Sequence, residues 1–253
     1  MRRARPTIRP CPKCGKPFRH EQWASFNGHT LAVSAAYTDG YICRPNMPKM
    51  DVLVRCPECG KWVWLEDTRI IRSYEGYEAR KLPVYMFKTP EQARQFNDRI
   101  VEGYVPDSEY EESQFSQFPC DADYRDALES GAADTPERER YLRIRAWWVG
   151  NGSRRRAKEP GPLSDAEHRN LEALADLCDE SDADQLLVKA EAMRELGRFA
   201  ESCHLLIGLL NREDGMTAAD LGSNGDAYGC NEEAKWNFRL ALRIAELVFN
   251  CNI

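Results

Sequence analysis

Two short stretches of the chain share one pattern: Cys11-Pro12-Lys13-Cys14-Gly15-Lys16 and Cys56-Pro57-Glu58-Cys59-Gly60-Lys61. In each stretch, two residues separate the cysteines, so both sulfur atoms can reach one ion. Two such turns facing each other supply four sulfur ligands in a tetrahedral arrangement, which is the arrangement that a structural zinc ion takes. The sequence therefore predicts a single zinc ion with the ligands Cys11, Cys14, Cys56 and Cys59.

A site of this kind has a closed coordination sphere. Because four protein ligands leave no open position for water, we expect a structural role and no catalysis at the metal. Metal binding then supplies folding free energy to a sheet that is too small to be stable by itself. The chain also lacks the Gly-x-Ser-x-Gly, P-loop and His-Glu-x-x-His motifs. The sequence thus predicts a protein that is not an enzyme and has no catalytic residues.

Two alternatives concern the ligands and the metal. His20, His29 and Cys43 lie between the two turns, and each is a candidate to replace one of the four cysteines. Tetrahedral sites of four sulfurs also hold iron, and paired Cys-Pro-x-Cys-Gly turns resemble those of rubredoxins, which transfer single electrons. Lysine follows each glycine where rubredoxins have an aromatic residue, and the separation of the turns is long, so zinc is favoured.

The segment between the turns is longer than the about 12–20 residues that usually separate paired zinc-ligand turns. Residues 31–37 are apolar and β-prone, and Asp39-Gly40 is a turn signal. Residues 52–54 lead into the second turn, and residues 62–65 leave it. These patterns predict a small antiparallel sheet with an extra hairpin inserted between the turns, over residues 1–70.

Residues 71–134 are expected to form a connecting segment with a short helix. Thr89-Pro90 is a helix start, with threonine as the N-cap and proline at the first helical position. A helix over 90–101 should follow it. Many acidic residues and no Lys or Arg occupy 102–123, which favours an exposed connection. A further short helix is predicted near 121–130.

Residues 135–253 read as a mainly α-helical domain. Thr135 begins a helix that is expected to run to about Trp148, where Gly150-Asn151-Gly152 ends it before a loop over 150–163. Ser164 and Glu167 form a capping-box pattern at the next helix start. Ser181 is the expected cap of a third helix that Gly197 ends. A fourth helix should run over 199–210, and its inward residues are predicted to be Cys203, Leu206, Ile207 and Leu210.

A weak internal repeat lies in this helical part. Small or apolar residues follow Gly197 at Ser202, Leu206 and Leu209, and Gly229 has Ala234, Phe238 and Ala241 at the same offsets. The separation of the two glycines is close to the about 34 residues of tetratricopeptide (TPR) repeats. The pattern predicts a TPR-like element in a helical bundle, with an ordinary helical hairpin as the alternative.

Composition limits the remaining possibilities. The 253-residue chain has a net charge of −6 and ten cysteines, which argues against bulk attraction to nucleic acid or to anionic membranes. The basic N-terminus is not followed by the apolar region of a signal peptide, and no apolar run is long enough to span a membrane. We therefore expect a cytoplasmic protein whose thiols are free or metal-bound.

One aromatic and basic cluster carries an alternative function. The pair Trp147-Trp148 precedes Arg154, Arg155 and Arg156, and aromatic rings beside arginines can stack on nucleobases. With the basic residues of positions 1–19, these three arginines are the candidate nucleic-acid contacts. The favoured interpretation places the tryptophans in the helical core and the arginines in an exposed loop.

The paired turns resemble those of zinc-ribbon proteins. With the segments 27–31 and 38–40, the helix over 142–148 and the TPR-like turn, the chain resembles uncharacterised bacterial proteins that join a zinc ribbon to a helical domain. The resemblance implies an α+β fold, with a small antiparallel zinc-ribbon sheet followed by a mainly α-helical, TPR-like domain. It carries no activity. We expect a zinc-binding module for protein–protein interaction, with a nucleic-acid-binding accessory factor and iron electron transfer as alternatives.

Overall fold

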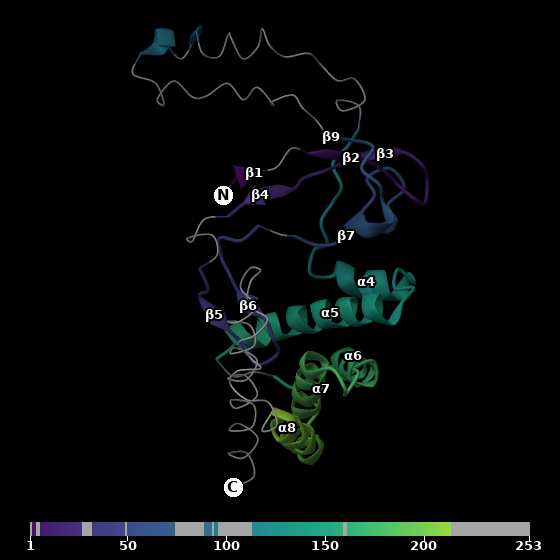
Figure 1. The fold of residues 1–253 in the computed structure, drawn as a ribbon, viewed down its shortest axis with the longest axis vertical. Helices are drawn as coiled ribbons and strands as arrows, with labels where there is room; N and C mark the ends of the chain where they lie inside the picture. The colour runs from purple at the N-terminus through teal and green to yellow at the C-terminus, as the bar shows by residue number, and fades with distance from the viewer. Residues whose placement is uncertain are drawn as a thin grey trace. The chain divides into compact units, whose positions relative to one another are not determined.

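The computed structural model describes residues 2–3, 6–26, 32–48, 50–73, 89–92, 94–95, 113–158 and 161–213 (Figure 1). The chain divides into two compact units. Unit 1 comprises Met1–Ala32 and Asn46–Pro119, and unit 2 comprises Val33–Pro45 and Cys120–Ile253. Short antiparallel strand pairs dominate the N-terminal part, and helices dominate the described C-terminal part, as the α+β prediction requires.

Two hairpins of unit 1 are each closed by a cysteine turn. Strand β2 (Thr7–Pro10) pairs with β3 (Pro17–His20) around the first turn, and β7 (Leu53–Arg55) pairs with β8 (Trp62–Trp64) around the second. The registers match, because the residues that flank the turns, Pro10 with Pro17 and Arg55 with Trp62, are directly paired. Unit 1 also contains β9 (Arg72–Ser73) beside β2, and β1 (Arg2–Arg3) paired with β4 (Trp23–Ser25).

The two hairpins share a hydrophobic core. Its buried members are Cys11, Phe18, Val54, Cys56 and Val63. Phe18 and Val54 come from different hairpins, and the cluster also contains Cys11 and Cys56, so packing in this core joins the two hairpins at their cysteine turns. The core is small, which is why a metal is expected to add to its stability.

A returning segment, residues 113–119, crosses both hairpins of unit 1. Arg19 N donates to Gln114 O at 2.8 Å, and Ser116 N donates to Arg19 O at 2.8 Å. Further along, Arg55 N donates to Gln117 O at 2.8 Å, and the Phe118 side chain packs on the shared core. The segment therefore ties β3 to β7 through backbone hydrogen bonds.

The helices of unit 2 follow one another along the chain, and each packs against the next. They are α4 (Asp123–Glu129), α5 (Pro136–Arg156), α6 (Asp165–Asp176), α7 (Ala183–Glu195) and α8 (Phe199–Glu213), after a 3-10 turn, η1 (Leu65–Asp67), in unit 1. Several predicted helix ends are confirmed. Thr135 caps α5, and Ser164 and Glu167 make the capping box of α6. The predicted start at Thr89 is also seen, since Thr89 Oγ1 accepts from Gln92 N at 3.2 Å.

Helix α7 differs slightly from expectation at its start and agrees at its end. Asp182, not Ser181, is the N-cap, because its carboxylate accepts from Asp184 N and Gln185 N. At the other end, Gly197 has a φ of 76°. Gly197 N donates to Arg194 O at 3.0 Å, and Arg198 N donates to Met193 O at 2.9 Å. These bonds are a Schellman motif, which a residue with positive φ permits.

Two clusters form the core of the helices. Leu186, Leu187, Ala190, Leu206 and Leu209 are buried between α7 and α8. The other cluster is buried between α5, α6 and α7, and consists of Trp147, Leu171, Leu174, Ala175, Cys178, Ala192 and Met193. The prediction that Ile207 lies inward is wrong, because its side chain is 48% exposed and Leu209 is buried instead.

Helix α5 continues beyond its predicted end. It runs through Gly150 and Gly152 to Arg156. Arg154, Arg155 and Arg156 therefore belong to a helix and not to the predicted loop. Each glycine costs about 1 kcal/mol in a helix interior. Contacts of the last two turns offset this cost, among them the buried Asn151 side chain, which bonds to Asp39 and Glu195. Glycine residues read as helix-end signals in the sequence give no information about these contacts.

The inserted hairpin is present, with β5 (Ala35–Ala36) paired with β6 (Ile42–Cys43) around the Asp39-Gly40 turn. The sequence pattern predicts it within a ribbon over residues 1–70, whereas the structure groups Val33–Pro45 with the helices.

Among the described residues, none of the helices is both long and apolar enough to cross a membrane. The repeat copy around Gly229 lies outside the described residues.

Candidate metal centre

The four predicted cysteines come together in unit 1. Their Sγ atoms all lie within 4.8 Å of one another. Cys11 Sγ is 3.8 Å from Cys59 Sγ, and Cys14 Sγ is 3.9 Å from Cys56 Sγ. A regular tetrahedron with metal–sulfur bonds of about 2.3 Å has sulfur–sulfur edges of about 3.8 Å, whereas a disulfide bond is about 2.05 Å long. The arrangement is compatible with a structural metal site.

The two cysteine turns are built alike. Gly15 N donates to Cys11 O at 2.8 Å, and Gly60 N donates to Cys56 O at 2.9 Å. Cys11 N also bonds to Lys16 O, and Cys56 N bonds to Lys61 O, both at 2.9 Å. The two glycines have φ values of 76° and 68°, a backbone conformation that residues with a side chain rarely adopt. Each Cys-Pro-x-Cys-Gly pattern thus fixes the same local backbone.

Burial divides the four thiols. Cys11 and Cys56 are each 1% exposed, while Cys14 is exposed and Cys59 is half-buried. Burial raises the pKa of Cys11 and raises that of Cys56 to about 12. Burial also acts on Cys59, but hydrogen bonds from the Lys61 backbone and from the neighbouring thiols outweigh it and lower the pKa of Cys59. A bound cation replaces these protons and removes the cost of ionising buried thiols.

A salt bridge joins the rims of the two turns. Lys16 Nζ lies 2.9 Å from Glu58 Oε2. The pair joins the lysine that follows Gly15 to a carboxylate of the opposite turn. Both side chains retain access to solvent, so the pair contributes little stability.

Two of the three alternative ligands, Cys43 and His20, are described and are not part of the cysteine cluster. Cys43 lies on β6 in unit 2. His20 is buried on β3, where its Nδ1 lies 3.1 Å from Ser116 Oγ and its ring packs against Phe118. Burial, followed by the nearby Arg9 charge, lowers the pKa of His20 to about 4. His29 lies outside the described residues.

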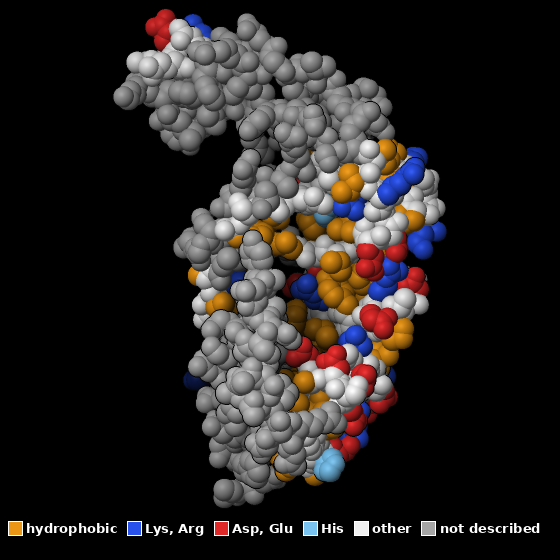
Figure 2. Space-filling model, in the orientation of Figure 1, with side chains coloured by type: hydrophobic (Ala, Val, Ile, Leu, Met, Phe, Trp, Pro, Cys, Tyr) orange, Lys and Arg blue, Asp and Glu red, His pale blue; other side chains and the backbone are white. Residues whose placement is uncertain are grey.

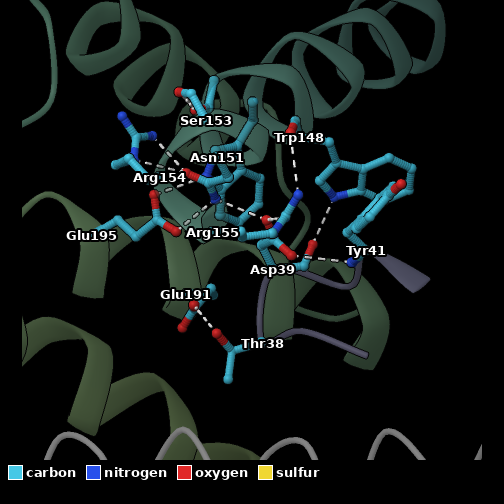
Figure 3. A network of polar contacts seen from close by, with 12 residues as sticks. Thr38, Asp39, Tyr41, Trp148, Asn151, Ser153, Arg154, Arg155, Glu191 and Glu195 are labelled. Carbon is cyan, nitrogen blue, oxygen red and sulfur yellow. Dashed lines mark hydrogen bonds and ion pairs between the residues drawn. The ribbon is translucent and has the colours of Figure 1, made fainter. Parts of the chain in front are cut away.

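A second polar cluster lies in unit 2, and it includes Trp148 and Arg155 of the predicted aromatic and basic cluster (Figure 3). Asp39, at the tip of the inserted hairpin, forms an ion pair with Arg155. Its Oδ2 also accepts from Asn151 Nδ2 at 2.7 Å, and its backbone carbonyl accepts from Trp148 Nε1 at 2.9 Å. The sequence signals for this cluster are the Asp39-Gly40 turn and the Trp147-Trp148 pair with its following arginines, and no local pattern joins the two.

The three candidate nucleic-acid arginines lie at the end of α5. Arg154 Nη1 is 2.9 Å from Glu167 Oε1, and Arg155 is paired with Asp39. Arg156 is exposed. The first two side chains are 18% and 12% exposed and serve contacts within unit 2, so they do not present free charges.

Trp147 and Trp148 also serve the interior of unit 2. Trp147 is buried in the helical core, and its Nε1 donates to Glu195 Oε2 at 2.9 Å. Trp148 packs edge-on against Tyr41 of the hairpin, with ring centroids 5.6 Å apart. Burial raises the pKa of Glu195, and the hydrogen bonds from Trp147 and Asn151 only partly oppose this.

Comparisons with protein-family models, curated proteins and solved structures found no match for the chain.

Proposed function

We propose that the chain is a non-enzymatic zinc-binding protein that acts through protein–protein interaction. Unit 1 would hold one structural zinc ion through Cys11, Cys14, Cys56 and Cys59. The observation that supports this most directly is the separation of 3.8 Å and 3.9 Å between sulfur atoms of opposite turns. These values match the edges of a tetrahedron of metal-bound thiolates.

Zinc in this position would have no open coordination site. Its chemistry is therefore to stabilise the fold, by joining two hairpins whose shared core is small. The likeness to zinc ribbons supports this role, since each Cys-Pro-x-Cys-Gly turn closes one hairpin. A reducing compartment such as the cytoplasm fits the proposal, because the described cysteines are free thiols.

The interaction role rests on the helical unit. Ser202, Leu206 and Leu209 follow the Gly197 turn and are all buried. Ser202 Oγ donates to Ala190 O at 2.8 Å, so α8 approaches α7 closely at this small residue. This packing supports a TPR-like hairpin, a type of unit that buries one face and offers another for peptides.

The metal assignment is tested by elemental analysis of the purified chain and of two cysteine variants. We expect one zinc per wild-type chain and loss of that zinc in Cys56→Ser. Cys120→Ser is the matched control, since Cys120 is exposed and outside the cluster. A red protein with iron would favour electron transfer, and a Cys56→Ser variant that keeps full metal content would refute the ligand set.

Nucleic-acid binding is the weaker candidate. Arg154 and Arg155 are already paired within unit 2. On the face drawn in Figure 2, acidic and basic side chains are interspersed over the described residues. A salt-dependent binding assay with DNA and RNA distinguishes the candidates. Retention of nucleic acid at low salt, with no protein partner in affinity purification, would favour the accessory-factor alternative over protein interaction.

A further inference from the structure

The turn Tyr37-Thr38-Asp39-Gly40-Tyr41 is held by α5 and α7 in the way that a protein holds a bound peptide (Figure 3). We propose that this helix face is a recognition surface for an aromatic–acidic turn, and that the chain's own hairpin, Val33–Pro45, occupies it. This inference deepens the proposed interaction function and rests on it, because it names the surface and the chemistry of a competing partner.

Arg155 is the centre of the recognition surface. Its guanidinium lies 4.5 Å from the ring centroids of both Tyr37 and Tyr41, and it forms an ion pair with Asp39 between them. A cation placed above the face of an aromatic ring is attracted to it, and charge-assisted hydrogen bonds are stronger than neutral ones. One arginine therefore contacts three side chains of the turn.

The surface also contacts the backbone of the turn and the side chain of Thr38, which precedes Asp39. Trp148 Nε1 donates to the Asp39 carbonyl at 2.9 Å. On α7, the fully buried Glu191 accepts a hydrogen bond from Thr38 Oγ1. Recognition thus uses both helices, and it combines main-chain and side-chain contacts.

The receptor groups are positioned by the helices themselves. Asn151 donates to Glu195 Oε1 at 2.8 Å, and its own Oδ1 accepts from Arg154 Nε at 3.2 Å. Glu191 is held by Arg194 through contacts of 2.7 and 2.8 Å. These partners belong to α5 and α7, so the side chains of Asn151 and Glu191 are also positioned by contacts that do not involve the turn. Such preorganisation lowers the cost of binding.

The turn is also preorganised. Asp39 Oδ1 accepts from Tyr41 N at 3.1 Å, and Tyr37 N donates to Tyr41 O at 3.0 Å. The paired strands β5 and β6 have two residues each, and an isolated hairpin is at best marginally stable. Contact with the helices therefore stabilises the hairpin in this conformation.

Among the described residues, the two buried clusters of α5 to α8 contain no residue of Val33–Pro45. The described contacts that join the hairpin to the helices are the polar and aromatic contacts of its turn. The contacts of Asp39, Tyr37 and Tyr41 are the kind that another chain with an aromatic-x-Asp-Gly-aromatic turn can reproduce.

The test measures binding of a fluorescein-labelled peptide of residues 33–45 to three forms of the full chain. The forms are wild type, a turn variant with Tyr37→Ala, Asp39→Ala and Tyr41→Ala, and the turn variant with Arg155→Met added. A tethered segment competes at an effective concentration on the order of millimolar. We therefore expect the turn variant to bind the peptide at least about tenfold more tightly than wild type.

The added Arg155→Met change should abolish this gain. In that background Asp39 is already absent, so Arg155→Met leaves no buried carboxylate of the turn unpaired. A peptide with Asp39→Asn is the control ligand, and it should bind more weakly than the native peptide. Far-UV circular dichroism and metal content verify that each form is folded. If the turn variant does not fold, Asp39→Asn alone replaces it.

Equal, weak binding by folded wild type and folded turn variant would overturn the proposed surface. Binding that survives Arg155→Met would also overturn it. A protein partner that is captured by wild type and still captured by the Arg155→Met form would leave the proposed interaction function standing and refute only this surface. Competition between the peptide and a captured partner would support both.

Discussion

At the scale of single residues, Arg155 and Arg156 show how neighbours in one helix acquire different roles. Arg155 is 12% exposed and faces Asp39, whose side chain is 3% exposed. Arg156, the next residue, is exposed. Burial makes the Arg155–Asp39 pair costly to break, since the remaining carboxylate would stay in a poorly solvated position without its cation.

Arg155→Met is expected to lower the free energy of unfolding of unit 2 by about 3–5 kcal/mol, the range for removing one partner of a buried ion pair. Arg156→Met is the matched control and should cost less than about 1 kcal/mol. Urea denaturation followed by far-UV circular dichroism measures both. Equal effects of the two substitutions would contradict the assignment of a buried pair.

His20 gives unit 1 a dependence on pH. Its pKa is about 4 in the folded chain, because burial and then the Arg9 charge disfavour the protonated ring, whereas an exposed histidine has a pKa of about 6.5. The unfolded state therefore binds more protons between these values. The stabilising contribution is complete above pH 6.5 and is lost as the pH falls towards 4.

We expect wild type to lose stability relative to His20→Gln as the pH falls from 7.5 to 5. The cysteine ligands are the same in both proteins, so acid release of metal affects both curves alike. Urea denaturation followed by tryptophan fluorescence at several pH values measures the difference. A difference that does not change with pH would show that His20 is not a buried neutral group.

At the scale of elements, α5 shows how tertiary contacts extend a helix beyond its sequence signals. Gly150 lies close to Glu167 of α6, and a Cβ on Gly150 would meet Glu167 Oε1 well inside van der Waals contact. A Cβ on Gly152 would have no neighbour within 4 Å. The same substitution should therefore have different effects at two positions of one helix.

Gly152→Ala is expected to stabilise unit 2 by about 0.5–1 kcal/mol, because alanine loses less backbone entropy in a helix. Gly150→Ala should be about 1 kcal/mol less favourable than Gly152→Ala, since Glu167 must leave its place in the capping box and its contact with Arg154. Thermal denaturation of the two variants compares them directly. Equal melting temperatures would indicate that Glu167 adapts without loss.

At the scale of the whole molecule, each unit has its own hydrophobic core. The cysteine turns share a cluster with Phe18, Val54 and Val63 in unit 1, while the described helices of unit 2 bury separate leucine-rich clusters. In sequence, however, Val33–Pro45 lies between the two cysteine turns and belongs to unit 2. The units are therefore linked by the chain path and are not consecutive segments.

If unit 1 holds the proposed zinc ion, a chelator under reducing conditions should unfold the strand pairs of unit 1 and leave most helical ellipticity intact. The fluorescence of Trp62 and Trp64, buried on β8, should change, while the ellipticity at 222 nm should fall only slightly because the helical clusters contain no metal ligand. Loss of both signals at the same chelator concentration would show that the helices depend on the metal as well.

Local patterns made several features predictable. The cysteine ligands, the Thr135 cap and the Ser164–Glu167 capping box depend on residues a few positions apart, and the sequence displays those residues directly. The two turns face each other in the structure, as the repeated pattern predicted for four ligands of one ion. Predictions from residue spacing are most reliable where the residues that set the backbone geometry or bind a ligand lie within one turn of the chain.

Long-range contacts could not be predicted in this way. The preference for Leu209 over Ile207 depends on how α8 lies against α7, and the bonds of Gln117 to Arg55 depend on a segment that returns to the ribbon. No local pattern encodes such pairings, because their partners are distant in the chain and become neighbours only after folding.

The amino-acid sequence by itself determined the four cysteines, the antiparallel hairpins around them and the helical character of the C-terminal part, because each follows from short-range spacing and backbone chemistry. Only the tertiary structure decided that α5 continues to Arg156 and that the inserted hairpin belongs with the helices. The physical reason is the buried contact set of Asp39 with Arg155, Asn151 and Trp148, whose partners are brought together only in the folded chain.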